Sequence, residues 1–61
     1  MADERLLTVA EVAQRIRVHP ESVRRWIREG RLRGIALGAR AGYRVPENEV
    51  ERFLNEARKA S

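Results

Sequence analysis

Apolar residues recur at helical spacing near the start of the chain. They follow one another at intervals of three and four, which places them on one face of a helix: Val9, Val12, Ala13 and Ile16. Thr8 stands where an N-cap is expected, and Glu11, three residues later, completes a capping box. Leu7 and Val12 can close a hydrophobic staple around this start. The pattern predicts a helix over residues 8–16.

A second helix is predicted over residues 20–29. Pro20 suits the first position of a helix, because its missing N–H needs no partner there. His19 is then the cap, and Gly30 can take the left-handed conformation that ends the helix. Three residues turn toward the core at helical spacing: Val23, Trp26 and Ile27. So short a link between two helices predicts a helix-turn-helix unit.

The apolar period then changes from helical to extended. Short strands are predicted over residues 32–37, where Ile35 and Leu37 alternate to one side, and over residues 43–45. The glycine-bracketed segment 38–42 is the hairpin tip. A last helix begins at Pro46-Glu47, with an apolar face made of Val50, Phe53, Leu54 and Ala57. The predicted fold is mainly α with a small two-stranded β-hairpin: a winged helix-turn-helix.

Length and composition narrow the class of protein. The 61 residues allow one domain, expected over residues 1–61 with a core at about 6–57. There is no cysteine, no apolar run of the roughly 18 residues that span a bilayer, and no signal-like apolar stretch at the start. His19 has no partners at metal-ligand spacing, and no nucleophile–base pair is visible. We therefore expect a cytoplasmic protein that is not an enzyme and carries no metal or cofactor.

The positive charge is concentrated in the middle of the chain. Residues 15–44 hold nine arginines against Glu21 and Glu29, a balance of +7, whereas the whole chain carries +4. All but one of the 13 basic residues are arginine, whose planar fork suits phosphates and guanine edges. Such a block favours a polyanionic partner, although a GC-rich genome would also enrich arginine.

The second helix carries the candidate base-contacting residues. Arg25 and Arg28 lie opposite its apolar face, and Ser22 and Arg24 flank them. An α-helix fits the major groove of B-DNA, where arginine can pair with guanine O6 and N7. The competing interpretation is an ordinary solvated surface on which Glu21 and Arg25 form an i, i+4 ion pair. The sharp link before this helix and the basic hairpin after it favour double-stranded DNA.

Three further arginines are candidate DNA contacts outside this helix. Arg40, at the hairpin tip, can enter a minor groove or contact a phosphate, and Arg44 faces away from the core. Arg17 lies beside the entry to the second helix, where phosphate contact and plain solvation stay open. The backbone N–H groups of Thr8 and Val9 can also bind phosphate, although Thr8 is first a cap. Arg31 and Arg33 add positive field without a predictable orientation, and Trp26, Tyr43 and Phe53 are expected to be packing residues.

The motifs together resemble a known family. The sequence resembles the MerR-like, excisionase-type winged helix-turn-helix family in three segments, at 7–13, 23–32 and 43–50, and the likeness covers about residues 6–55. The resemblance implies a bacterial, phage or mobile-element protein whose second helix enters the major groove and whose wing contacts backbone or minor groove. Arg17 and His19 depart from the usual glycine and Ser/Thr cap. In carrying arginine at that place, the sequence resembles the small free-standing regulators of the family, and this favours the role of a regulator.

These observations predict a sequence-specific duplex DNA-binding protein, a transcription regulator using residues 20–29 in the major groove and the wing 33–45 on backbone or minor groove. No long dimerisation helix follows in the sequence, so no small-molecule effector is expected. We expect several copies of the protein to bind at adjacent DNA sites. An excisionase-like recombination directionality factor needs the same surface. A small protein-interaction module, such as an antitoxin or adaptor, is the alternative from another class.

Overall fold

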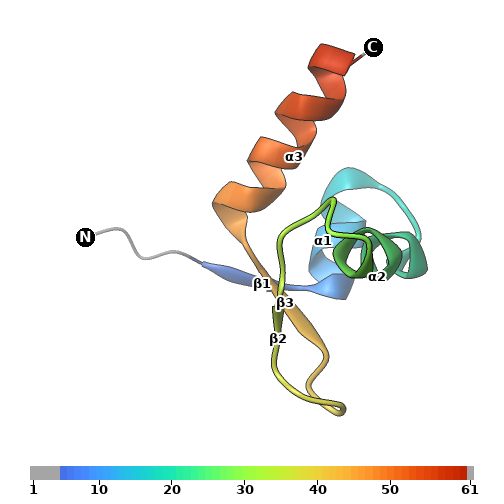
Figure 1. Ribbon diagram of the computed structural model, residues 1–61, viewed down its shortest axis with the longest axis vertical. Coiled ribbons are helices and arrows are strands. Elements are labelled where there is room, and N and C mark those ends of the chain that lie inside the picture. Colours follow the sequence, from blue (N-terminus) through green and yellow to red (C-terminus); the bar gives the residue numbers. More distant parts are fainter. Residues whose placement is uncertain (1–4, 61) are drawn as a thin grey trace.

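A computed structural model describes residues 5–60, and Figure 1 shows their arrangement. The elements follow in the order β1 (Leu6–Thr8), α1 (Val9–Ile16), α2 (Pro20–Arg28), β2 (Ile35–Ala36), β3 (Tyr43–Pro46) and α3 (Glu47–Ala60). The mainly helical winged helix-turn-helix is confirmed. The expectation of a start without a signal sequence, and the outer domain limits at Met1 and Ser61, lie outside the described residues. No helix within residues 5–60 is long and apolar enough to cross a membrane.

The core lies where α1, α2 and the small sheet meet. Eight apolar residues are buried there: Leu7, Val9, Val12, Ala13, Val23, Leu32, Val45 and Val50. Trp26 and Ile27 pack against this cluster from α2, as their spacing with Val23 predicts. The two helices of the turn unit and the sheet therefore share a single apolar centre.

α1 begins with the predicted capping box. The Thr8 backbone N–H donates to Glu11 Oε1 at 2.8 Å, and the Glu11 N–H donates to Thr8 Oγ1 at 3.1 Å. Leu7 and Val12, the expected staple, are both buried. The helix ends at Arg17, which has a left-handed φ of 60° and donates its N–H to the Ala13 carbonyl. Arg17 is thus the point at which the chain turns toward α2.

α2 also begins and ends as the sequence predicts. His19 Nδ1 accepts the N–H of Glu21 at 3.0 Å, which confirms His19 as the cap, and Pro20 occupies the first turn. At the other end Gly30 has φ +80°, and its N–H donates to the Ile27 carbonyl at 3.1 Å. Because residues 17–19 alone link the helices, α1 and α2 cross sharply (Figure 1).

The sheet has a third strand that the sequence did not predict. β3 lies in the middle, antiparallel to β1 on one side and β2 on the other. β1 escapes prediction because it is three residues long and ends at Thr8, the cap of α1. The strand expected over 32–37 is shorter in the structure and covers only Ile35–Ala36. Leu32 lies outside it, with its side chain buried in the core.

The two sides of the sheet differ in burial. Leu7 pairs with Val45 on the core side. Side chains alternate along a strand, so Thr8, Arg44 and Ile35, which share one row of the register, lie on the outer side. Ile35 and Leu37, expected to alternate to one side, are 44% and 49% exposed there.

α3 is attached to the domain mainly through its first half. Val50 is buried, and Phe53 and Leu54 are half-buried, with the Phe53 ring 5.1 Å from that of Trp26. Ala57, predicted on the same buried face, is exposed because it lines an open hollow between α3 and the loop after α2. The helix rises away from the hairpin, which projects at the opposite end of the molecule (Figure 1).

Candidate nucleic-acid interface

The outward face of α2 carries the predicted arginines. Arg24, Arg25 and Arg28 are exposed, and Ser22 is half-buried beside them. Val23 is completely buried, so it fixes the rotation of the helix about its axis. The face opposite the core is consequently rich in guanidinium groups, with Glu21 as its one acidic member.

Glu21 holds two of these arginines in ion pairs. Arg24 Nη1 donates to Glu21 Oε1 at 2.9 Å, and Arg28 Nη2 donates to Glu21 Oε2 at 3.3 Å. The hydrogen bond from Arg28, followed by that from Arg24, holds the pKa of the Glu21 carboxyl below its ordinary value. The Glu21–Arg25 pair of the competing interpretation does not form among the described residues, where Glu21 pairs with Arg24 and Arg28 instead. Each carboxylate oxygen already faces a guanidinium on the same side of the helix, three and seven residues on.

Arg25 differs from its neighbours on this face. Within residues 5–60 its side chain makes no ion pair and no hydrogen bond. Its donors are therefore available to a base edge without the loss of an internal contact. Arg24 and Arg28 instead present the donors that Glu21 leaves unused.

The hairpin made of β2, β3 and the residues 37–42 between them forms the wing. Arg40 is exposed at its tip, between Gly38 and Gly42, both of which have positive φ. Arg44 lies on the outer side of the sheet, as predicted, but it is half-buried and partly occupied: its Nη1 donates to the carbonyls of Ala41 at 2.9 Å and Tyr43 at 3.0 Å. Arg44 thus reaches a ligand only through Nε and Nη2.

A hollow of about 400 Å³ separates α2 from the wing. It is lined by Arg24 from α2 and by the inner side of the wing: Ala36, Gly38, Ala39, Gly42 and Tyr43. The small wing residues leave it open, and Arg24 supplies its charge. Tyr43, expected only as a packing residue, is half-buried at this wall. Sequence spacing could not indicate this, because the wall forms only when the hairpin folds back beside α2.

The start of α1 offers less to a phosphate than the sequence suggested. The N–H of Thr8 is donated to Glu11 in the capping box, which also lowers the pKa of the Glu11 carboxyl, chiefly through that Thr8 backbone bond. The cap, which the sequence favoured for Thr8, is therefore confirmed, and its N–H is not available to a phosphate while the capping box is formed. Arg17, at the turn, is exposed and within residues 5–60 makes no side-chain hydrogen bond or ion pair.

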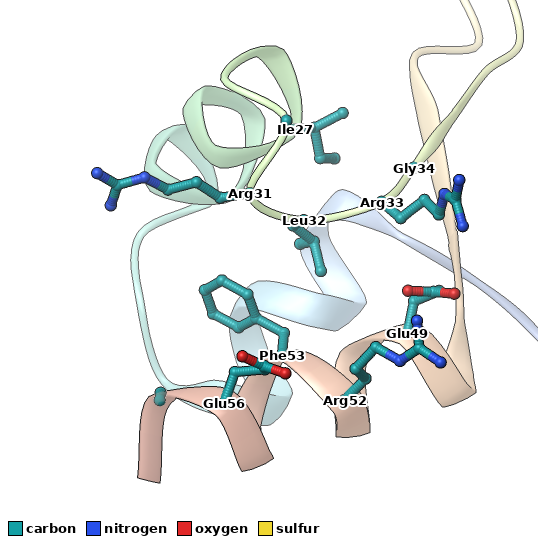
Figure 2. A pocket seen from close by; sticks show the side chains of 11 residues that line it. Ile27, Arg31, Leu32, Arg33, Gly34, Glu49, Arg52, Phe53 and Glu56 are labelled. Atoms are coloured by element: carbon teal, nitrogen blue, oxygen red, sulfur yellow. The ribbon is translucent and has the colours of Figure 1, made fainter. Parts of the chain in front are cut away.

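A second and larger hollow, of about 890 Å³, lies between the end of α2, the following loop and α3 (Figure 2). Ile27, Leu32 and Phe53 form its apolar walls, and Arg31 and Arg33 stand at its two ends. Arg31 also pairs with Glu29 at 3.5 Å. The structure therefore places these two arginines beside α3, so the basic block of the sequence does not gather on one surface.

Comparison with known proteins agrees with this architecture. A family model described as a helix-turn-helix domain matches residues 6–58, which is most of the chain. The chain belongs to this helix-turn-helix family. No curated protein and no solved structure matches it. The family match confirms the helix-turn-helix family that the sequence resembles, and it makes the chain a domain of a DNA-binding kind.

In this helix-turn-helix domain most of the predicted contact residues fall into two groups, one on α2 and one on the wing. The group on α2 has Arg24 at the wall of the smaller hollow. The other is on the wing, where Arg40 makes no side-chain hydrogen bond or ion pair with residues 5–60 and Arg44 is partly occupied. Arg17 belongs to neither group and lies at the turn before α2. The arrangement can place one strand of a duplex between helix and wing, with base edges before the helix.

Proposed function

We propose that this helix-turn-helix domain is a sequence-specific duplex DNA-binding protein that acts as a transcription regulator. One observation carries the proposal: α2, whose outward face is rich in exposed arginines, lies across an open hollow from the wing, with Arg24 in the wall of that hollow. A major groove accepts an α-helix, and the phosphates beside it fall where the wing projects.

Within the complex, α2 enters the major groove. Arg25 makes a bidentate contact with a guanine, because its donors are not engaged in the free protein. Arg24 and Arg28, held by Glu21, meet the groove edges with their remaining donors, and Ser22 contacts a base or phosphate near the start of the helix. Arg40 supplies the wing's contact with backbone or minor groove.

On this proposal DNA binding is the only activity of the chain, and it needs no catalysis, cofactor, metal or small-molecule effector. One module of this size buries about 600–1,000 Å² on DNA, which is little for tight occupancy of a single half-site. Several copies on adjacent sites therefore supply the occupancy that regulation needs. Arg17 and Arg44 contribute phosphate contacts at either side of the helix.

Selection of bound sequences from random duplexes tests the proposal. We expect enrichment of a short motif containing at least one guanine, and recovered duplexes that bind at least about 10³-fold more tightly than random DNA. Recovery of no motif, with equal binding to all duplexes, would contradict sequence specificity. If instead an acidic protein binds the chain and DNA does not compete, the chain is an interaction module such as an antitoxin or adaptor.

The excisionase-type resemblance supports a second role for the same surface, that of a recombination directionality factor. The two roles differ in their consequence rather than in their contacts. Placing the selected motif before a reporter gene tests regulation directly: expression should change with the intact protein and not with Arg25→Ala. A reporter that does not respond, together with altered integrase-dependent recombination at the same motif, would favour the excisionase-like role.

A further inference from the structure

The wing tip is held by very few contacts. Two backbone hydrogen bonds close its base, from the Leu37 N–H to the Gly42 carbonyl at 2.9 Å and from the Gly42 N–H to the Gly38 carbonyl at 3.0 Å. All residues from 38 to 42 are exposed. Gly38 and Gly42, with φ of +117° and +73°, add conformational freedom at both ends of the tip. Left to these contacts, the segment that carries Arg40 would sample many conformations.

Arg44 supplies the missing restraint. Its Nη1 donates to the Ala41 carbonyl at 2.9 Å and to the Tyr43 carbonyl at 3.0 Å, so a single nitrogen ties the tip to the strand behind it. Among the described residues, the bond to Ala41 is the only hydrogen bond that residues 39–41 make. Ala41 directly follows Arg40 in the chain, so the restraint acts one peptide away from the proposed DNA contact.

The position of Arg44 suits this role better than a role in direct contact alone. It lies in the middle strand of the sheet, paired with Thr8 on one side and Ile35 on the other. It is half-buried, whereas Arg40 is exposed. Both hydrogens of Nη1 lie in the plane of the guanidinium, so this one nitrogen can hold two carbonyls in fixed directions.

We infer that Arg44 is a positioning residue, which orders the wing tip in the free protein so that Arg40 meets DNA without a further loss of conformational freedom. The inference rests on the proposed function, because Arg40 is the group through which Arg44 acts. Ordering a loop before binding raises affinity by removing that cost from the binding step. The remaining Nε and Nη2 donors of Arg44 stay available to a phosphate.

Hydrogen exchange in the DNA-free protein tests the restraint itself. In Arg44→Met, which keeps an apolar stem but removes the donors, the amides of Leu37 and Gly42 should exchange at least about threefold faster than in the original chain. Amides of α2 should be unchanged. Equal exchange at Leu37 and Gly42 in both proteins would overturn the inference, whatever the chain binds.

A double-mutant cycle on a selected duplex tests the connection to Arg40. Arg44→Met should weaken binding at least about threefold more in the original chain than in the Arg40→Ala background, since Arg44 has nothing to position there. The matched control is the cycle with Arg25→Ala on α2, where the two losses should multiply. Losses that multiply with Arg40→Ala as well would show that Arg44 only makes its own contact. Sub-multiplicative losses with both partners would show a general loss of folding.

Discussion

At the scale of single residues, the turn between the two helices contains a strained position. Arg17 has φ 60°, a conformation that costs an L-residue roughly 1–2 kcal/mol relative to the right-handed region. Glycine is the usual residue at such a helix end. Arg17 therefore combines a strained backbone with an exposed cationic side chain at the turn before α2.

Replacing Arg17 with glycine should therefore separate stability from binding. Relief of the strain, partly offset by the greater freedom of glycine in the unfolded chain, should raise the free energy of unfolding by about 0.5–1 kcal/mol in urea titrations. DNA affinity should fall in the same variant because a cation is lost. The matched control is Gly30→Ala at φ +80°, where a Cβ meets no atom within 4 Å and only the strain remains; it should destabilise. A less stable Arg17→Gly variant would contradict this account.

Arg25 should determine a base preference, since it is the arginine of the α2 face without an internal partner. Arg25→Ala should reduce discrimination at one base pair by about 1–3 kcal/mol, measured by competition between duplexes that differ at single positions. Arg40→Ala should weaken all duplexes alike. Arg52→Ala, an exposed arginine on α3 beside the larger hollow, is the control and should leave discrimination unchanged. Equal losses on specific and random duplexes for Arg25→Ala would exclude a base-reading role.

At the scale of elements, a single residue, Thr8, joins strand β1 to helix α1. Thr8 pairs with Arg44 in the sheet and also caps α1. Thr8→Ala should cost about 1 kcal/mol of unfolding free energy, because the Glu11 N–H loses its acceptor. Thr8→Ser keeps the hydroxyl and should recover most of this loss. Equal destabilisation by serine and alanine would assign the effect to the strand instead of the cap.

The same cap predicts an acid-sensitive contribution to stability. The pKa of Glu11 is lowered from its ordinary value of 4.5, chiefly by the Thr8 N–H. A carboxylate with a lower pKa in the folded state stabilises that state above its unfolded pKa and loses the contribution as pH falls through the folded pKa. The stability gap between the original chain and Glu11→Gln should thus be full near neutral pH and close as pH falls below 4.5. The measurement is the free energy of unfolding from urea titrations at each pH. A gap that stays constant across this range would contradict the prediction.

At the scale of the whole molecule, charge is divided between two surfaces. α2 and the wing carry the proposed interface, whereas Arg31 and Arg33 line the larger hollow beside α3, where Glu49 and Glu56 also lie (Figure 2). The net charge of +4 therefore does not give the charge of either surface by itself. Only part of the basic block should neutralise phosphates.

The salt dependence of binding should reflect that division. With about five phosphates neutralised, the logarithm of the binding constant should fall against the logarithm of salt concentration with a slope near −4 to −5 in anisotropy titrations. Arg40→Ala should reduce the slope by about 1. Arg33→Ala, in the hollow, should leave it nearly unchanged. A slope near −1 for the original chain would count against a phosphate-contacting interface.

The sequence by itself determined the three helices and the rotation of α2. The capping box at Thr8, Pro20 after His19 and Gly30 at the end of α2 act within one helical turn, so their consequences can be read from spacing. The inward direction of Val23 follows from the same local geometry. The exposed arginines of α2 could be predicted for this reason.

Only the tertiary structure decided where segments far apart in the chain meet. β1 exists because β3 pairs with it, and Leu32 lies outside the predicted strand because its side chain is buried in the core. The wall formed by Tyr43 and the place of Arg33 across the larger hollow from α3 depend on how the hairpin and α3 fold back on the helices. Local spacing carries no information about such contacts, because their partners are chosen by packing and not by distance along the chain.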